Sequence, residues 1–202
     1  LAEKYKQLER RLKLPFLIEN SPSALDSCIG GVERVAEIVA AMKEFSHPGS
    51  DKPVSADLNQ ALKSTVKVST NEWRHVAEVT FDLAEDLPTV SCYAGEINQC
   101  FLNIIVNAAH ALVDKFGDER LGRITISTAA NENGVEVRIQ DNGPGIPADV
   151  LARIFDPFFT TKPVGEGTGL GMSAVYGLLR RWKGGIAVES SPGHGATITL
   201  FI

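Results

Sequence analysis

The sequence predicts an α+β fold, a two-layer sandwich in which helices cover one face of a mixed, mostly antiparallel sheet. Segments in which apolar and polar residues alternate occur in pairs joined by short turns, as in two β-hairpins. Longer segments with apolar residues at helical spacing separate these pairs. The resulting order, helix, strand, helix, hairpin, helix, hairpin, differs from the one-by-one alternation of a parallel α/β sheet.

Each element has its own signal in the sequence. In "VAEVTFDL", apolar and polar residues alternate, as in a strand with one buried face. Asn133-Gly134 is a strong turn signal between "RITIST" and "VEVRIQ". The last two strands, "GIAVESS" and "ATITLFI", are linked by a turn rich in glycine. The expected elements are helices over residues 56–69, 95–116 and 170–182, a strand over 76–83, and hairpin strands over 123–128, 135–140, 185–191 and 196–202.

A helical region over residues 1–47 precedes this domain. Apolar residues recur there at alternating spacings of three and four, as in the seam of a bundled helix. The seam residues are Leu25, Cys28, Val32, Val35, Val39 and Met42. Because such a seam needs a partner helix, we expect a homodimer through this region. The stretch "PGSDKP", residues 48–53, has the composition of a linker, so the main domain is expected over residues 54–202.

Composition narrows the class of protein. The chain of 202 residues carries a net charge of -5, and its basic residues are scattered, which argues against nucleic acid as a partner. Three cysteines without metal-binding or disulfide spacing fit a cytoplasmic setting. The longest apolar run is interrupted by polar residues well short of the roughly 20 that cross a bilayer, so we expect no membrane contact here. The first residue, a leucine, suggests a longer chain, which could include a membrane anchor.

The stretch "NIIVNAAHA" places Asn103, Asn107 and His110 on one side of the expected long helix. Their amide oxygens could hold a hydrated magnesium ion, which prefers oxygen ligands and substrate phosphates. The alternative is that both asparagines bond neighbouring backbone, as buried polar groups usually do.

Three further motifs contain glycine or aromatic residues. In "DNGPGIP", Asp141 ends a strand and could accept a hydrogen bond from an exocyclic amine, although the same residues form a good turn. In "IFDPFFTTK", phenylalanines could anchor a loop or latch a lid, with Lys162 reaching phosphate oxygens. In "TTKPVGEGTGLGMS", glycines precede a helix N-terminus, where a polyphosphate could approach free N–H groups. The alternative for this last stretch is a flexible surface loop.

Together these motifs and their order are specific. The ordered set is Asn103-x-x-x-Asn107, Asp141-x-Gly143-x-Gly145, Phe155 to Phe159, Gly167-x-Gly169-x-Gly171, and Gly193-x-Gly195-Ala196-Thr197. It resembles the N, G1, F, G2 and G3 boxes of the ATP-binding catalytic domain of bacterial sensor histidine kinases. The resemblance covers about residues 54–202 and implies the Bergerat ATP-binding fold. It also implies that residues 1–47 are part of the dimerisation and histidine-phosphotransfer hairpin.

The resemblance implies ATP and Mg²⁺ as cofactors and a response regulator receiver domain as partner. Asn107, with Asn103, would coordinate magnesium, Asp141 would bind the adenine amino group, and residues 155–167 would form a mobile ATP lid. The residues that it implies bind ATP are Asn103, Asn107, His110, Asp141, Gly143, Gly145, Ile146, Phe159, Thr160, Lys162, Gly167, Thr168, Gly169, Leu170, Gly171 and Thr197.

Two features depart from the family pattern. None of the four histidines is followed by an acidic residue as the family's acceptor is, so we expect the acceptor helix to lie outside this sequence. Asn103 stands where the related gyrase, Hsp90 and MutL ATPases carry a glutamate that activates water, and an amide is no general base. Slow hydrolysis is therefore expected, with ATP kept for transfer to a histidine. The alternatives are a hydrolase or serine kinase of the wider superfamily, or a non-catalytic ATP-binding dimerisation module.

Overall fold

The computed structural model describes residues 13, 16, 20–32, 53–117, 121–132, 134–163 and 167–202. Residues 20–32 are helical, and the seam residues Leu25 and Val32 are 61% and 69% exposed there. The rest of the seam beyond Val32, and all of the expected linker except Pro53, lie outside the described residues. Of the helices in the described ranges, none has the length and hydrophobicity that a membrane span requires.

The main domain follows the predicted order, with some short additions. Its elements are β1 (Val54–Ala56), α3 (Leu58–Val68), α4 (Thr70–Trp73), β2 (Ala77–Leu83), β3 (Val90–Cys92), α5 (Ala94–Phe116), β4 (Gly122–Asn131), β5 (Gly134–Asp141), α6 (Ala148–Leu151), α7 (Gly171–Arg181), β6 (Gly185–Ser190) and β7 (Ala196–Phe201).

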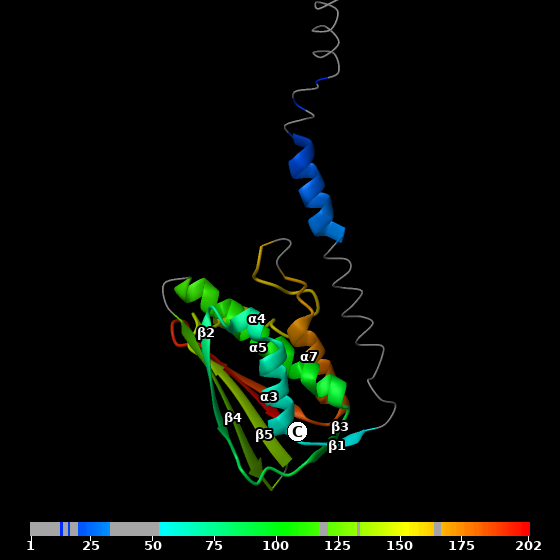
Figure 1. The fold of residues 1–202 in the computed structure, drawn as a ribbon, viewed down its shortest axis with the longest axis vertical. Helices are drawn as coiled ribbons and strands as arrows, with labels where there is room; N and C mark the ends of the chain where they lie inside the picture. The colour runs from blue at the N-terminus through cyan, green and yellow to red at the C-terminus, as the bar shows by residue number, and fades with distance from the viewer. Residues whose placement is uncertain are drawn as a thin grey trace, which may run out of the picture.

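The sheet is mixed and mostly antiparallel, as predicted. Its strand order is β2-β4-β5-β7-β6, in which β2 and β4 run parallel and the other neighbouring pairs run antiparallel. Helices α3, α5 and α7 lie together on one face of the sheet (Figure 1). A separate two-stranded sheet pairs β1 with β3. The predicted two-layer α+β sandwich is confirmed.

The long helix α5 forms the centre of the core. It contacts α3 and α7 on its sides and β4 and β5 below. Its fully buried residues include Ile97, Phe101, Ile105 and Leu112, each with 0% exposure. Truncating such a side chain to alanine costs about 2–5 kcal/mol, so this face fixes the position of the helix. The polar residues on the opposite side of α5 are thereby held in place.

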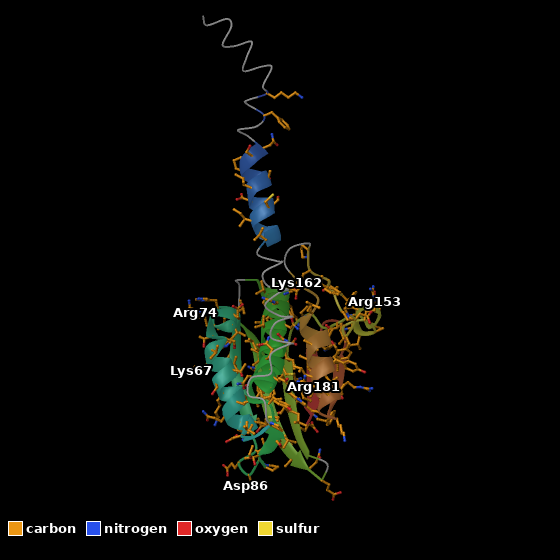
Figure 2. The ribbon with its side chains drawn as sticks, turned by 90° about the vertical axis from the view of Figure 1, so that its right-hand side faces the viewer. Lys67, Arg74, Asp86, Arg153, Lys162 and Arg181 are labelled. Atoms are coloured by element: carbon orange, nitrogen blue, oxygen red, sulfur yellow. The ribbon has the colours of Figure 1, made fainter. Side chains whose placement is uncertain are left out.

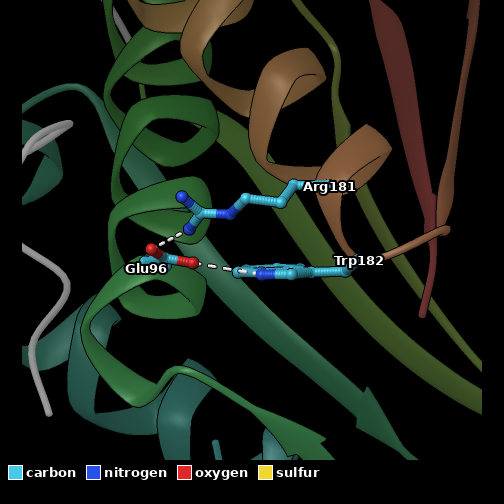
Figure 3. Close-up of polar contacts among 3 residues, drawn as sticks. All are labelled: Glu96, Arg181 and Trp182. Carbon is cyan, nitrogen blue, oxygen red and sulfur yellow. Dashed lines mark hydrogen bonds and ion pairs between the residues drawn. The ribbon is translucent and has the colours of Figure 1, made fainter. Parts of the chain in front are cut away.

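A buried carboxylate ties α5 to α7. Glu96, 7% exposed in the first turn of α5, accepts hydrogen bonds from the guanidinium of Arg181 and from the indole N–H of Trp182 at 3.0 Å (Figure 3). Its negative charge also lies at the positive end of the α5 dipole. The start of α5 is thus fastened to the end of α7.

The first expected helix begins later than the sequence suggests. The side chain of Asp57 accepts a hydrogen bond from the amide of Gln60 at 3.0 Å, so Asp57 caps α3, and the residues before it form β1. Sequence patterns missed β1 and β3 because three residues are too few to show alternation.

Candidate functional site

Glycine loops and the polar side of α5 converge at one end of the helical layer. The amide of Asn103 donates to the carbonyl of Gly171, the first residue of α7, at 3.3 Å. A Cβ placed on Gly171 would lie 3.8 Å from side-chain atoms of both Asn103 and Asn107. The N-terminus of α7, with its free backbone N–H groups, therefore lies against the predicted asparagine pair.

The two asparagines differ in their bonding. The carbonyl oxygen of Asn103 accepts from Gln99 at 3.1 Å, and its amide nitrogen bonds Gly171, so both ends of this side chain are engaged. Asn107 is half-buried, and its amide makes no hydrogen bond to any residue that the structure describes. Asn107 is thus the member of the pair whose amide is left to bind a ligand.

Asp141 is a buried carboxylate at the end of β5, with 8% exposure. Its Oδ1 accepts the amide of Gly143 at 2.7 Å and the amide of Ala196 at 3.3 Å. Burial raises the pKa of this carboxyl above its ordinary value, while these two amides, the charge of Lys115 and the amide of Asp141 itself act in the opposite direction. Within the described residues, Oδ2 has no hydrogen-bond donor. This second oxygen can accept one from a ligand.

The turns around Asp141 are packed without room for a side chain. A Cβ on Gly145 would approach the carbonyl oxygen of Ser191 to 2.1 Å, and one on Gly195 would approach that of Asp141 to 2.1 Å. Both glycines have positive φ, 76° and 80°. The Ser190 hydroxyl joins the turns by donating to the Gly195 carbonyl at 2.7 Å and accepting from the Ile146 amide at 2.8 Å.

The ammonium of Lys115, near the end of α5, binds the same turns. It donates to the carbonyl oxygens of Asn142 at 2.8 Å, Gly143 at 2.9 Å and Gly193 at 3.0 Å. Gly143 also packs against α5, since a Cβ there would lie 3.3 Å from that of Ala111. The turns that surround Asp141 are therefore fastened to α5.

The segment between β5 and α7 reaches back to α5 at its other end. The Lys162 ammonium contacts Nδ1 of His110, and Figure 2 shows Lys162 at one end of the main domain, with Asp86 at the opposite end. Burial, and then the charge of Lys162, lower the pKa of His110. Gly167 packs on Thr160 and Lys162, because a Cβ there would lie 2.5 Å from the Thr160 hydroxyl. Residues 164–166 of the expected lid lie outside the described residues.

Aromatic residues anchor this segment. Phe155 stacks on Tyr176 of α7 with ring centroids 5.1 Å apart, and Arg153 lies over the Phe159 ring at 4.3 Å. Phe158 has a positive φ of 66°, and its amide donates to the carbonyl of Gly169 at 2.9 Å. The segment is thereby joined to the loop that leads into α7.

The approach to α7 has its own hydrogen bonds. The Thr168 hydroxyl accepts from the amide of Leu170 at 3.3 Å, and Leu170 stands at the N-cap of α7. Gly169 has a φ of 65°, and a Cβ there would lie 2.4 Å from the carbonyl carbon of Phe158. A side chain at residue 169 is therefore excluded, which agrees with the predicted need for glycine.

Thr197 does not join this group. It pairs with Gln140 in the register between β5 and β7, so the side chains of the two residues share a sheet face. Asp141, the next residue along, faces the other side. The β7 residue at Asp141 is Ala196, whose amide donates to the carboxylate. The side chain of Thr197 thus lies on the sheet face opposite to that of Asp141, and its expected part in ATP binding stays a prediction.

Comparison with protein families gives a match over residues 93–202 to the histidine kinase-, DNA gyrase B- and HSP90-like ATPase family. This range contains every glycine loop described above as well as α5 and α7. The chain belongs to this ATPase family. ATP is therefore the nucleotide that its domain binds.

Curated relatives include sensor kinase CckA of Brucella abortus (strain 2308), 34% identical over 84% of this chain and 19% of the relative. Sensor histidine kinase ZraS of Klebsiella oxytoca is 31% identical over 84% of this chain and 36% of its own length. The chain thus spans about a fifth to about a third of these relatives.

Solved structures agree with the fold. The nucleotide-free catalytic domain of histidine kinase ThkA matches with a TM-score of 0.62 and 27% identity, over 75% of this chain and 95% of that chain. Full-length ShkA in complex with AMPPNP matches with a TM-score of 0.67 over 83% of this chain and 34% of that chain. At 24% identity, the second comparison supports the fold alone.

Sequence reasoning about this ATPase domain missed the residues that hold the glycine turns from behind. Lys115 and Ser190 act on backbone atoms, and Ala196 acts through its amide. A side chain that bonds backbone from another element has no fixed spacing from it in sequence. No motif could have identified Lys115 and Ser190, whereas Ala196 stands in the last glycine motif, which did not indicate the role of its amide.

Proposed function

We propose that the chain is the catalytic module of a two-component sensor histidine kinase. Residues 54–202 bind Mg-ATP and transfer its γ-phosphoryl group to a histidine outside residues 1–202, from which it passes to an aspartate on a response regulator. Residues 1–47 belong to the dimerisation and phosphotransfer region and residues 48–53 form the linker. Dimerisation through residues 1–47 accords with the apolar residues Leu25, Ile29 and Val32, each more than half exposed on the described part of that helix.

The observation that carries this proposal is the pairing of a buried base site with a helix N-terminus. Asp141 has one carboxylate oxygen held by two amides, and in the described part of the chain its other oxygen has no donor. An adenine amino group is a donor of the right kind for that oxygen. Earlier along the same side of α5, beside Asn103 and Asn107, Gly171 opens α7 without a side chain, so phosphates can reach the free N–H groups.

The residues around the α7 N-terminus fit a magnesium triphosphate. Bound Mg-ATP supplies the transferable phosphoryl group and the metal that neutralises its charge. Asn107 offers an unengaged amide oxygen as metal ligand, whereas Asn103 holds Gly171 in place. Lys162 offers a positive charge to phosphate oxygens, and His110, whose pKa is lowered, offers a neutral donor. The packed glycine turns orient the base, and residues 155–167 are the proposed mobile ATP lid over the phosphates.

Transfer is favoured over hydrolysis by the chemistry of α5. Asn103 has no carboxylate with which to take a proton from water, and its amide is engaged at both ends. Without a positioned base, ATP persists until an acceptor histidine reaches the γ-phosphate. None of the four histidines of the sequence has the acidic neighbour of the family's acceptor.

The test incubates the chain with γ-labelled ATP, alone and with a separately produced helical hairpin that carries the acceptor histidine of a sensor kinase. We expect turnover below about 1 s⁻¹ for the chain alone, the low end for typical enzymes. We expect label on the hairpin that is stable to alkali and lost in acid, as for phosphohistidine. A hairpin with His→Ala is the control. Rapid hydrolysis by the chain alone would favour a hydrolase, and acid-stable label would favour a serine kinase.

A further inference from the structure

Lys115 binds the backbone of the turns around Asp141, the residue that we expect to bind the adenine base. All three N–H donors of a lysine ammonium are used here, on the carbonyl oxygens of Asn142, Gly143 and Gly193. The first two belong to the turn after Asp141, and the third belongs to the turn between β6 and β7. One charged atom on α5 therefore joins two turns that are about 50 residues apart in sequence.

These two turns also meet directly. The amide of Gly193 donates to the carbonyl of Pro144 at 2.6 Å, and the amide of Ala196 donates to Asp141. The distance between the turns thus determines whether Asp141 keeps both of its amide donors. Because the carbonyls that Lys115 binds converge on one point, their mutual repulsion is offset only while a cation occupies that point.

We propose that Lys115 is the positioning residue of the base site: its ammonium joins the Asn142–Gly143 turn to the Gly193 turn and so fixes Asp141 for adenine. The inference rests on the proposed ATP-binding function and names a residue that acts through Asp141. Lys115 contributes geometry through three hydrogen bonds and also contributes a positive charge. The charge favours the ionised form of Asp141, which accepts the adenine amino group.

The electrostatics of Asp141 support the second contribution. Burial raises the pKa of Asp141, and the charged side chain that opposes this effect is Lys115. The remaining opposing groups are backbone amides. Removing the ammonium therefore raises the pKa of Asp141 further, so that the carboxyl becomes protonated at higher pH. A protonated carboxyl binds adenine less well, and ATP affinity then declines at higher pH than in the wild type.

The test is calorimetric titration of the whole chain with ATP and magnesium from pH 5 to pH 8. It compares the wild type with Lys115→Met, Lys115→Arg and, as a matched surface-charge control, Lys63→Met. Lys63 is an exposed residue of α3 that takes part in no hydrogen bond or ion pair within the described residues. Taking the ratio of variant to wild-type dissociation constants at each pH cancels the titration of ATP itself. Thermal unfolding of each variant shows whether it is folded.

We expect K115M to weaken ATP binding about tenfold at pH 7, and the ratio to grow as the pH falls. We expect K115R to keep the wild-type pH profile but to lose several-fold in affinity, because the donors of a guanidinium are spread over a planar fork and cannot meet at one point. K63M should bind as the wild type does.

Two results would overturn the inference while leaving the proposed function intact. A ratio of K115M to wild-type dissociation constants that does not change with pH would mean that the charge of Lys115 does not act on Asp141. Wild-type affinity in a folded K115R, which keeps the charge, would mean that convergence of the three hydrogen bonds does not matter. A wild-type chain that binds no ATP would refute the proposed function, and this inference with it.

Discussion

Replacing Asp141 by asparagine separates base recognition from folding. Both amide donors of this residue, Gly143 and Ala196, bond the same oxygen, Oδ1. Asparagine keeps an acceptor oxygen at that place, so D141N preserves these two bonds. The substitution replaces the second oxygen, Oδ2, by an NH₂ group. An acceptor for the adenine amino group is thereby replaced by a donor that opposes it.

The expected magnitude follows from one lost hydrogen bond to a charged group. Such a bond contributes about 1.5–3 kcal/mol, so ATP affinity should fall about 10- to 150-fold, with the opposed donors favouring the upper end. Stability should move in the other direction. The pKa of Asp141 is raised in the folded chain, so its ionised form opposes folding at neutral pH. D141N should therefore be as stable as the wild type or more stable at pH 7, and this difference should vanish below about pH 4, where unfolded aspartate is protonated.

The assay pairs calorimetric titration of ATP with urea unfolding at pH 7 and at pH 3.5. Asp149→Asn, the same chemical change at an exposed position in the first turn of α6, is the matched control and should bind ATP normally. Wild-type ATP affinity in folded D141N would refute the assignment of the base site. A D141N chain that unfolds more easily than the wild type at pH 7 would refute the reasoning about burial.

Three further predictions concern the surroundings of the site. Removing Arg181 leaves Glu96 buried without its cation, so R181M should lower the free energy of unfolding by about 2–3 kcal/mol. E96Q should lower it by only about 1 kcal/mol. The reverse order in urea unfolding would contradict this reasoning. G145A should destabilise the fold by more than 3 kcal/mol because its Cβ meets a carbonyl, whereas G193A, with nothing within 4 Å, should cost about 1–2 kcal/mol from its positive φ alone. Equal thermal shifts for both variants would exclude the steric explanation. His110 should titrate by NMR below the ordinary value of 6.5, because burial and a neighbouring ammonium disfavour its charged form; a value above 6.5 would contradict the contact with the lysine.

The sequence predicted the larger elements of the fold because their signals are local. The alternation in β4 and β5 and the apolar periodicity of α5 identified these elements to within a few residues. The short helices α4 and α6, of four residues each, carry no periodicity and were missed. Their existence depends on the packing of the chain around them.

In the candidate site, too, features with a local sequence signal could be predicted, and features that depend on contacts between distant residues could not. The glycines at residues 145, 169 and 195 stand out in the sequence because a positive φ restricts residue type at a fixed position, whereas the roles of Asp141 and these glycines in ATP binding stay predictions. The side-chain direction of Thr197 follows from the register of β7 against β5, which the sequence motif does not state. Lys115 was missed because its partners lie 27, 28 and 78 residues away.

The two halves of the site are built in different ways, and this difference bears on how the domain binds ATP. On the base side, main-chain atoms stand where any Cβ of Gly145 or Gly195 would lie, and Lys115 and Ser190 bond the turns from behind. These contacts fix the turns around Asp141, so little ordering cost is left for base binding. On the phosphate side, a Cβ on Gly171 would make only ordinary contacts with Asn103 and Asn107, at 3.8 Å. The segment before α7 is fastened there by the stacking of Phe155 on Tyr176 and by the contact of Lys162 with His110 of α5. Packed turns around Asp141 beside a segment held mainly by side chains suit the proposed kinase, which would hold ATP while its γ-phosphate waits for a histidine from another helix.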